Sequence, residues 1–306
     1  MAADPTPILE LIDGFRRSKT LFAAVKLGIF DGSRPLGFAT VRLLEACVGL
    51  GLLEKRGSEF VNSALADQYL RSHRPESLAG YARSAGNGLY ERWGHLEQAV
   101  IDGAVTQSPA REPAPEAYRD FVAGMHAFGL LSSPRVAAAF DLSRFRKFVD
   151  LGGCTGHLAL AIQQLYPDIK IGVFDVPPVI EAAREYTGSR AELFAGNFFA
   201  DPLPAADLYG LGKVLHNQTE PNIRILLERI RAALPDGGGL LIAERLLDED
   251  RSGPLHVHLS SLNMLVAAGG VERTFSEYRT LLEAAGFHGV RCQKTGVLVD
   301  AIFAQK

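Results

Sequence analysis

The most informative stretch of this sequence is Val149-Asp150-Leu151-Gly152-Gly153-Cys154-Thr155-Gly156, where an apolar run ends and a helical pattern begins. Glycines in a strand-to-helix turn let the backbone turn tightly and approach a ligand, and the helix behind it presents unpaired N–H groups. A dinucleotide turn of the form G-x-G-x-x-G that began at Gly152 would need glycines where Cys154 and His157 stand. The spacing therefore argues against a bound pyrophosphate, while a structural turn without a ligand stays open.

Asp175 supplies a second sign of a ligand, because it ends the next apolar run. A carboxylate at the end of this strand can accept hydrogen bonds from both ribose hydroxyls of an adenosine, although an Asp here is also a common helix cap. The first turn fits the D/E-x-G-x-G-x-G pattern of S-adenosylmethionine binders through Asp150, Gly152 and Gly156, with Cys154 in place of the middle glycine. Together the two features favour an S-adenosylmethionine site.

The region from Lys147 onward alternates short apolar runs with helical segments, which is typical of a parallel sheet covered on both faces. The last two runs are joined by only a few residues around Gly296, too few for a crossover helix, so we expect an antiparallel hairpin. The sequence thus predicts a Rossmann-like α/β sheet that ends in a reversed hairpin, as in methyltransferases. The expected strands are Phe148–Leu151, Ile169–Phe174, Leu193–Phe194, Ala206–Leu215, Gly239–Leu246, Val290–Cys292 and Val297–Phe303, and the expected helices between them include His157–Tyr166, Pro178–Tyr186 and Ile223–Leu234.

The first third of the chain has the pattern of helices. Apolar residues recur at helical spacing over Leu9–Ile29, and Val41–Leu53 is a second apolar-periodic helix. A hairpin-like stretch, Glu54–Asn62 with Gly57 at its turn, follows directly. A helix followed by a small β-wing predicts a winged-helix element, and a plain helical packing domain remains an alternative.

The prolines and small residues of Asp102–Pro115 indicate a linker, so we predict two domains, residues 1–112 and 113–306. A hydrophobic fraction of 47% and a charged fraction of 22% are those of a soluble globular protein. The net charge of −3 gives no attraction to nucleic acid or to an acidic membrane surface. Three widely spaced cysteines form neither a disulfide framework nor a metal cluster, and we read no signal peptide or membrane span. We therefore expect a cytoplasmic protein without nucleic-acid, membrane or metal partners.

Several longer motifs occur in the order and spacing of the plant-caffeate-type O-methyltransferases, which the sequence resembles over nearly its whole length and most densely from Phe140 onward. Within that superfamily the chain looks like the acetylserotonin O-methyltransferases and their acetylserotonin methyltransferase-like relatives. The motifs are Asp150–Gly156, Phe174–Pro177, Gly196–Pro204 and Val214–His216, and the narrower assignment rests on Leu246–Asp250 and Ser261–Val266.

The resemblance implies a helical N-terminal dimerisation domain, an S-adenosylmethionine domain, a homodimer, and a pocket between the domains for a small aromatic hydroxyl acceptor. By motif position, the turn at Gly152 holds the methionine part, Asp175 the ribose, and Asn197 with Phe198 the adenine. The full expected cofactor set is Asp150, Gly152, Gly153, Asp175, Val176, Asn197, Phe198 and Lys213. The residues expected to wall the acceptor pocket are Trp93, Met125, His126, Phe128, Asn217, Asn263 and Met264.

Three titratable residues follow different parts of the predicted sheet: His216 after the fourth strand, Glu244 near the end of the fifth, and Glu272 before the final helix. Ligands of an open α/β sheet bind beyond the carboxyl ends of its strands, so these side chains can converge. A neutral hydroxyl is a poor nucleophile and needs one base, and an imidazole suits that work near neutral pH. The resemblance assigns His216 as the base with the two glutamates flanking it, although a histidine after a buried strand is also often structural.

The chain departs from the family pattern at several site positions. Asn217 and Gln218 stand where relatives usually carry Asp and Trp, which removes a charge and an aromatic wall beside the base. Asn197 replaces the usual Asp at the adenine, and its carbonyl can still accept a hydrogen bond without charge assistance. Ala267 and Gly129 stand where the acetylserotonin enzymes carry Gln and Trp. These changes affect the prediction of which substrate is bound more than the prediction of which reaction is catalysed.

A larger departure lies near the N-terminus. Between Asp31 and Arg42 the relatives have an additional helix-turn-helix piece, where this chain has only residues 32–41. We therefore expect a reduced winged-helix element, with consequences for the dimer or for the lid of the pocket.

The sequence supports four possible functions to different degrees. An active O-methyltransferase is the leading hypothesis, and a catalytically weak S-adenosylmethionine binder that acts as a binding or scaffold protein is the alternative. A protein that uses S-adenosylmethionine only to assist another reaction is disfavoured because His216 is retained. A DNA-binding regulator is disfavoured because Val41–Leu53 lacks the basic residues of a recognition helix.

Overall fold

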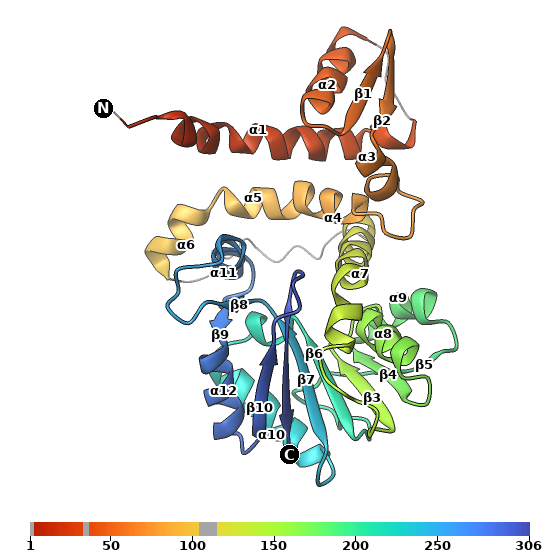
Figure 1. The fold of residues 1–306 in the computed structure, drawn as a ribbon, viewed down its shortest axis with the longest axis vertical. Coiled ribbons are helices and arrows are strands. Elements are labelled where there is room, and N and C mark those ends of the chain that lie inside the picture. Colours follow the sequence, from red (N-terminus) through yellow and green to blue (C-terminus); the bar gives the residue numbers. More distant parts are fainter. Residues whose placement is uncertain (1–2, 33–36, 104–114) are drawn as a thin grey trace. The chain divides into compact units, whose positions relative to one another are not determined.

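The computed structural model describes residues 3–32, 37–103 and 115–306, drawn as a ribbon in Figure 1. Its contacts form two compact units, one of Met1–Glu91 with Glu112–Ala127 and the other of Arg92–Arg111 with Phe128–Lys306. This division differs from the single boundary at residue 112 that we expected. One reason is that Trp93, in the short segment after Glu91, donates a hydrogen bond of 3.0 Å to Asn263 of the second unit. The expected linker falls mostly outside the described residues.

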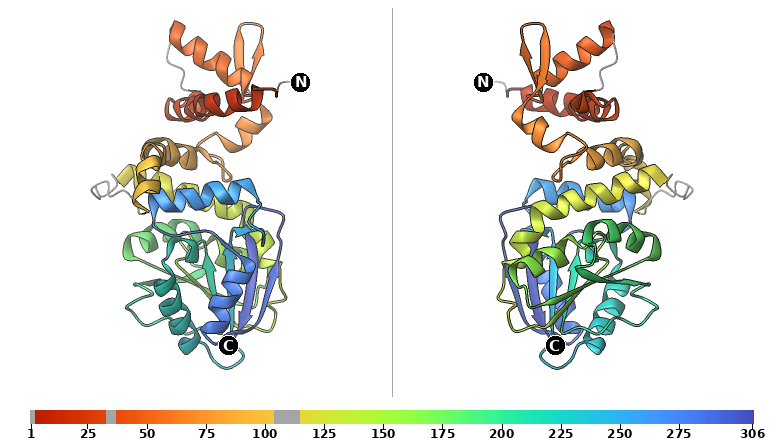
Figure 2. Two further views of the ribbon diagram at one scale, coloured as in Figure 1. Left: turned by 90° about the vertical axis from the view of Figure 1, so that its left-hand side faces the viewer. Right: turned by 90° about the vertical axis from the view of Figure 1, so that its right-hand side faces the viewer.

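The second unit is built on a seven-stranded sheet in the order β10-β11-β7-β6-β3-β4-β5 (Figures 1 and 2). The five strands β3 to β7 pair in parallel, and β11 pairs antiparallel with both β7 and β10. The predicted parallel sheet with a reversed C-terminal hairpin is therefore confirmed. The strands are β3 Lys147–Leu151, β4 Lys170–Asp175, β5 Ala191–Ala195, β6 Leu208–Gly212, β7 Gly239–Glu244, β10 His288–Gln293 and β11 Asp300–Gln305.

Helices cover both faces of this sheet, because successive strand residues point to opposite sides. On one face, Val149 packs in a cluster with apolar residues of α10 and α12. On the other face, its neighbour Phe148 packs with residues of α7, α8 and α9. The helices of this unit are α6 Leu96–Asp102, the end of α7 (Pro115–Ala137), α8 His157–Leu165, α9 Pro177–Thr187, α10 Glu220–Ala233, α11 Leu255–Ala267 and α12 Phe275–Ala284.

The strand that precedes His216 ends earlier than predicted. We expected a strand over Ala206–Leu215, but β6 ends at Gly212 and Lys213 takes a left-handed conformation with φ of 55°. Leu215–Asn217 then form a short 3₁₀ turn, η3. Similarly, the run predicted as one strand over Gly239–Leu246 is split into β7 and β8 (Leu246–Leu247), and β8 pairs with β9 (Arg273–Thr274). Both breaks place polar side chains at the carboxyl edge of the sheet.

The first unit packs helices around a small β-hairpin. The hairpin pairs β1 (Leu53–Arg56) with β2 (Glu59–Asn62), and Gly57 at its turn has a positive φ of 62°, as the turn requires. The helix before it was predicted to reach Leu53, but α2 ends at Gly49, and Leu53 begins the first strand instead. The other elements are α1 Thr6–Lys26, η1 Ile29–Asp31, α2 Phe38–Gly49, α3 Ala64–Tyr69, α4 Ala79–Ser84, η2 Ala85–Leu89 and α5 Tyr90–Trp93, of which the last ends in the second unit.

A helix followed by a two-stranded wing is what the sequence predicted for this unit. Part of the shortened stretch before α2, residues 33–36, lies outside the described residues. Among the helices that the structure describes, none combines the length and the apolar character that crossing a membrane requires.

Candidate active site

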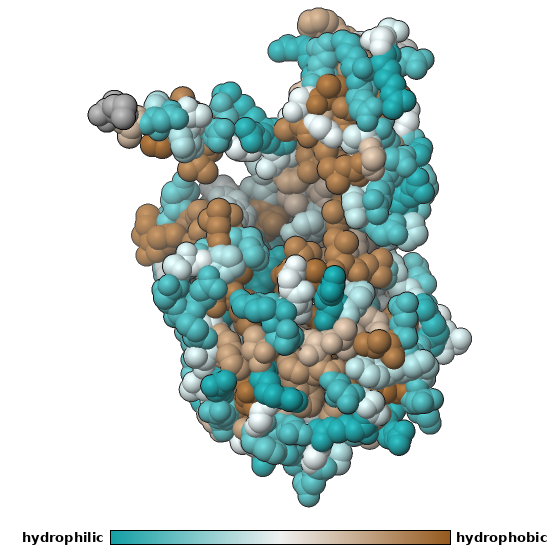
Figure 3. Space-filling view, viewed as in Figure 1, coloured by the Kyte–Doolittle hydropathy of each residue, from teal (hydrophilic) through white to brown (hydrophobic). Residues whose placement is uncertain are grey.

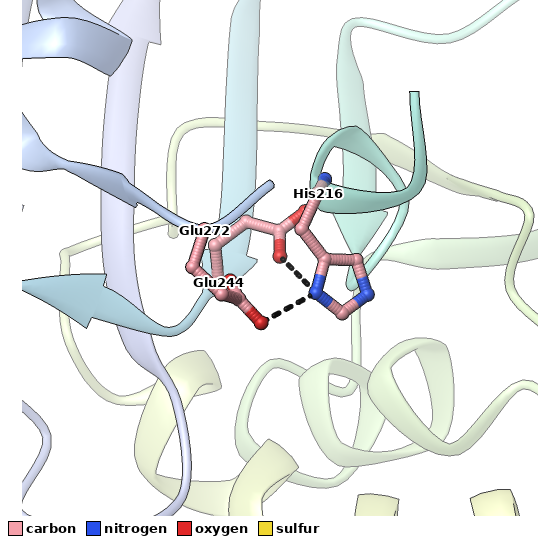
Figure 4. A group of neighbouring side chains, drawn as sticks. All are labelled: His216, Glu244 and Glu272. Carbon is pink, nitrogen blue, oxygen red and sulfur yellow. Dashed lines mark hydrogen bonds and ion pairs between the residues drawn. The ribbon is translucent and has the colours of Figure 1, made fainter. Parts of the chain in front are cut away.

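The three titratable residues named from the sequence meet at the carboxyl edge of the sheet (Figure 4). His216 lies on η3, Glu244 is the last residue of β7, and Glu272 directly precedes β9. Nδ1 of His216 is 2.8 Å from Oε1 of Glu272 and 3.8 Å from Oε2 of Glu244. All three are buried, with exposed fractions of 3%, 0% and 0% for His216, Glu244 and Glu272. The structure thus brings together residues that are up to 56 positions apart in the chain.

The two glutamates do different work. Oε1 of Glu244 accepts the backbone N–H of Leu215 at 2.8 Å and that of His216 at 3.3 Å, so this carboxylate holds the turn that carries the histidine. Burial raises the pKa of Glu244. The charge of His216 lowers this pKa in part, and the charge of Glu272 raises it further. Burial acts on Glu272 as well, but hydrogen bonds from His216 and Ser260 and the charge of Arg245 outweigh it, so the pKa of Glu272 is lowered.

The hydrogen bond to Glu272 sets the tautomer of His216. An ionised carboxylate only accepts hydrogen bonds, so the proton of the neutral imidazole resides on Nδ1. Nε2 then has no proton and offers its lone pair. An imidazole in this state can remove a proton from a nearby hydroxyl.

Three residues of this region were not singled out from the sequence. Ser260 donates to Oε1 of Glu272 at 2.6 Å, and Arg245 donates to Ser260 at 2.5 Å. Gly270 lies so close to the turn that an added Cβ would stand 1.9 Å from the carbonyl oxygen of His216. The pair of glycines just before Glu272 is a sequence signal for close contact between two backbone segments. The contacting residue, His216, lies 54 positions earlier than Gly270, and only the structure shows the contact.

The glycine turn after β3 is tightly constrained. Gly152 has a φ of 67°, and an added Cβ would stand 2.9 Å from Cγ2 of Val214. A Cβ at Gly153 would stand 2.7 Å from Cβ of Asp150, so side chains are excluded at both positions. Cys154 has a φ of 51° and therefore keeps the left-handed backbone that the middle glycine of the pattern would adopt more easily. The turn is preserved, at the expense of some backbone strain.

Two aspartates lie beside this turn. Asp175 accepts the backbone N–H of Cys154 at 2.9 Å and that of Val176 at 2.8 Å, and burial raises its pKa against these two bonds. Asp150 is 1% exposed, and neither of its carboxylate oxygens has a hydrogen-bond partner among the described residues. Burial raises the pKa of Asp150 to about 7, the charge of Asp175 adds to the effect, and the backbone N–H of Ala159 acts against it. A buried carboxylate whose oxygens lack a hydrogen bond of normal geometry fits a ligand that brings its own donor.

The remaining expected cofactor residues lie around the same edge of the sheet. Phe198 is close enough to the turn that a Cβ on Gly152 would stand 3.4 Å from its ring. Oδ1 of Asn197 accepts the N–H of Phe199 at 2.9 Å, and the ammonium of Lys213 lies 4.1 Å from the centre of the Phe128 ring. Burial, and then the charge of Arg245, lower the pKa of Lys213 to about 8. Of the expected cofactor residues, Val176 and Asn197 are exposed, and the roles of the whole set stay predictions.

Comparison with known proteins identifies the family. The model of the O-methyltransferase domain matches residues 97–288. Human acetylserotonin O-methyltransferase is 40% identical over 97% of this chain and 96% of its own length. The chain belongs to the S-adenosylmethionine-dependent O-methyltransferases.

Two solved structures support this assignment and the fold. The crystal structure of human N-acetylserotonin methyltransferase in complex with SAM (S-adenosylmethionine) has a TM-score of 0.92 at 38% identity, covering 100% of this chain and 99% of the other. The structure of PigF with SAH (S-adenosylhomocysteine) has a TM-score of 0.89 at 28% identity, covering 99% and 100%. The resemblance stated from the motifs is therefore confirmed.

The expected acceptor-side residues of this O-methyltransferase fall on both units. Trp93, Phe128, Asn217, Asn263 and Met264 belong to the second unit, and Met125 and His126 lie on the part of α7 in the first unit. Their contact with an acceptor stays a prediction. At Gly129 an added Cβ would stand 2.1 Å from the ring of His157, so this ring fills the space beside the position where acetylserotonin enzymes were expected to carry a tryptophan.

The three expected catalytic residues also resemble a cation site. His216, Glu244 and Glu272 each offer one ligand atom, and these atoms lie within 4.8 Å of one another. The hydrogen bond between Nδ1 and Glu272 and the backbone bonds of Glu244 engage Nδ1 and one oxygen of each carboxylate, while Oε2 of Glu244 and of Glu272 has no hydrogen-bond partner among the described residues. A reaction without a metal ion stays our expectation.

Proposed function

We propose that this O-methyltransferase methylates a hydroxyl of a small aromatic acceptor, a hydroxyindole or a phenol, with His216 as the general base. The observation that carries the proposal is the buried hydrogen bond of 2.8 Å between Nδ1 of His216 and Glu272, which leaves Nε2 as the acceptor of a proton. The similarity to acetylserotonin O-methyltransferases supports a hydroxyindole as the first acceptor to test.

The residues of the chain supply binding, orientation and one proton transfer. S-adenosylmethionine, when bound, supplies an electrophilic methyl group whose bond to sulfur breaks as the bond to the acceptor oxygen forms. Nε2 of His216 takes the hydroxyl proton, and the charge of Glu272 stabilises the resulting imidazolium. Glu244 contributes by holding the N–H groups of Leu215 and His216, which keeps the imidazole in place.

We propose that the cofactor binds along the turn at Gly152. The two unpartnered oxygens of Asp150 can accept from the ammonium of its methionine part, and Asp175 retains acceptor capacity for the ribose. Asn197 and Phe198 face the adenine in this arrangement. Because Oδ1 of Asn197 already accepts from Phe199, its remaining contact with the adenine is weaker than that of a free carboxylate.

The test is a binding measurement followed by an acceptor screen. Calorimetric titration should show binding of S-adenosylmethionine and S-adenosylhomocysteine and no binding of NAD. The screen should offer N-acetylserotonin, simple phenols and flavonoids with a labelled methyl group. Transfer to at least one of them supports the proposal, and binding without transfer to any of them contradicts it.

A scaffold or binding protein is the second candidate. Asn217, where relatives carry Asp, supports it, because its amide donates to the carbonyl of Lys213 at 3.1 Å and brings no charge to the base. Asn217→Asp should raise a weak transfer rate if the site is only weakened. If neither the native chain nor this variant transfers a methyl group while both bind the cofactor, the second candidate becomes the better account.

We also propose that the protein forms a homodimer through α1. Ile8, Leu11, Ile12 and Phe15 follow the spacing of one helix face, and their exposed fractions are 63%, 81%, 60% and 54%. Figure 3 shows apolar side chains on α1 and also over α6, where Val100 and Ile101 are exposed. An exposed stripe of large apolar residues is typical of a surface that a partner covers.

A further inference from the structure

A chain of hydrogen bonds continues outward from the histidine beyond the two glutamates. Oε1 of Glu272 accepts from Nδ1 of His216 and also from Oγ of Ser260, which is 2.6 Å away on α11. Oγ of Ser260 in turn lies 2.5 Å from Nη1 of Arg245, the residue that follows Glu244. Ser260 is 5% exposed, so water does not compete strongly for its hydroxyl.

Chemistry fixes the direction of every bond in this chain. A guanidinium only donates, so Ser260 accepts from Arg245 and its single proton points to Glu272. An ionised Glu272 only accepts, so the bond from His216 also runs toward it. Hydrogen bonds that run in one direction polarise one another, which strengthens the hold on Oε1 of Glu272.

We propose that Arg245 and Ser260 are positioning residues that hold Glu272 against His216 and draw negative charge away from this carboxylate. This inference rests on the proposed function of His216 as the base. Neither residue needs to touch the acceptor for the effect, because both act through the carboxylate. Their loss should therefore change the rate and its pH dependence and leave cofactor affinity intact.

The other charges around this site are consistent with that role. Glu244 and Glu272 face the imidazole from β7 and from the segment before β9, and Lys213 and Arg245 contribute opposite charge. The buried phenol of Tyr278 lies close enough to both glutamates that their charges, after burial, raise its pKa, and Arg273 acts on it in the opposite direction. Within this group, Arg245 is the cation whose hydrogen bond reaches Glu272 through one hydroxyl.

The outer side of Arg245 faces a cavity. Arg245 lines a cavity of about 200 Å³ together with His256, Lys294 and Asp300. Lys294 in this lining is paired with Asp300 at 3.1 Å. Arg245 also lies 5.3 Å from the centre of the Phe128 ring, a distance at which a guanidinium and an aromatic ring attract each other.

The sign of the expected pH effect follows from the charge on Glu272. Without the Ser260 hydroxyl, the carboxylate is more basic and stabilises the imidazolium of His216 more strongly. The neutral imidazole then forms only at higher pH. In Ser260→Ala, the acid limb of the pH–rate profile should therefore move to higher pH by about 0.5 to 1, so kcat on the acid limb should fall about three- to tenfold with KM unchanged.

The experiment compares four variants of the full chain, with N-acetylserotonin or the best acceptor of the screen as substrate. Ser260→Ala and Arg245→Met should both move the acid limb upward, and Ser260→Thr, which keeps the hydroxyl, should restore the native profile. Arg224→Met is the matched control, because Arg224 is an exposed arginine paired with Glu220 at 2.6 Å. Its profile should equal that of the native protein.

A second readout needs no acceptor. Imidazole ¹⁵N resonances of His216, assigned with His216→Gln, report the tautomer and its titration with S-adenosylhomocysteine bound. The native protein should show Nδ1 protonated, and Ser260→Ala should titrate at higher pH. Because Arg245 is partly exposed, Arg245→Met tests the same chain without opening a buried cavity.

The outcomes separate the inference from the proposed function. If His216→Gln keeps full transfer activity, the proposed base is wrong, and the inference fails with it. If His216→Gln loses transfer but Ser260→Ala and Arg245→Met keep native rates, profiles and ¹⁵N titrations, only the positioning inference is overturned. A rise in KM alone would assign Arg245 to acceptor binding and would also overturn it.

Discussion

The imidazole of His216 is bonded through Nδ1 to Glu272 at 2.8 Å, and both side chains are almost completely buried. This relationship makes one ring nitrogen a donor and leaves the other as an acceptor. A buried carboxylate is costly unless its charge is satisfied, and here Glu272 has donors from two sides. The arrangement is what a base for a hydroxyl proton requires.

Replacing the base should abolish transfer without loss of the cofactor site. We expect His216→Gln to lower kcat by about 10²–10⁴-fold, the usual effect of a positioned general base. Binding of S-adenosylhomocysteine, measured by calorimetry, should stay within the native range, because the turn at Gly152 and Asp175 follow or end β3 and β4, not β6. His288→Gln, at an exposed position on β10, is the control and should be fully active.

Asp150 should couple cofactor binding to pH. Its pKa of about 7 lies above the ordinary value of 3.8, so the folded protein binds a proton there that the unfolded chain has lost, and stability falls as pH rises through this window. Without cofactor, Asp150→Asn should therefore melt at a higher temperature than the native protein at about pH 8 and show little gain at about pH 4.

The ionisation of Asp150 should have the opposite effect on the affinity for the cofactor. An ammonium next to Asp150 favours the charged carboxylate, so native affinity for S-adenosylmethionine should increase as pH rises through about 7. Asp150→Asn should bind more weakly and without this rise. Equal affinities for native protein and variant at about pH 8 would remove Asp150 from the site.

Asp175 should be needed for the ribose. Two hydrogen bonds to a charged group contribute roughly 1.5–3 kcal/mol each, so Asp175→Ala should weaken S-adenosylmethionine binding by well over tenfold. The same carboxylate accepts from Cys154 and Val176, so a circular dichroism melt must accompany the measurement. Native affinity in a folded variant would show that the ribose binds elsewhere.

The apolar face of α1 should mediate association. Leu11→Glu combined with Phe15→Glu places two charges on this face and should turn a dimer into a monomer, measured by light scattering at micromolar concentration. Glu10→Lys lies on the opposite side of the helix and should leave the dimer intact. A native protein that is already monomeric under these conditions would refute the proposal.

Removal of metal ions should leave transfer unchanged. Nδ1 of His216 and Oε1 of both glutamates are engaged by hydrogen bonds within the protein, so we expect equal rates after dialysis against a strong chelator. Recovery of lost activity by a divalent cation would instead assign these residues to a metal site.

Periodicity and glycine spacing were enough to predict the sheet, its reversed hairpin and the turn at Gly152. These features depend on local rules: apolar runs that are buried on both faces form parallel strands, and a positive φ needs glycine or a strained substitute such as Cys154. Candidate catalytic residues could be named for a related reason, because ligands bind beyond the carboxyl ends of strands. The early end of β6 at Gly212 could not be predicted in this way. Glu244, which is distant in the chain, accepts a hydrogen bond from the backbone N–H that follows at Leu215, so the strand does not continue.

The sequence by itself determined the order of the strands along the chain, the family with its class of cofactor, and which three residues could supply and flank a base. Only the tertiary structure decided that Glu244 and Glu272 differ, that Asp150 is buried without a partner, and that Arg245 reaches Glu272 through Ser260. The physical reason is that local patterns specify secondary structure and burial, whereas charge and hydrogen bonding depend on which distant segments meet. Glu272 and His216 are 56 residues apart, and nothing in either local sequence specifies the other.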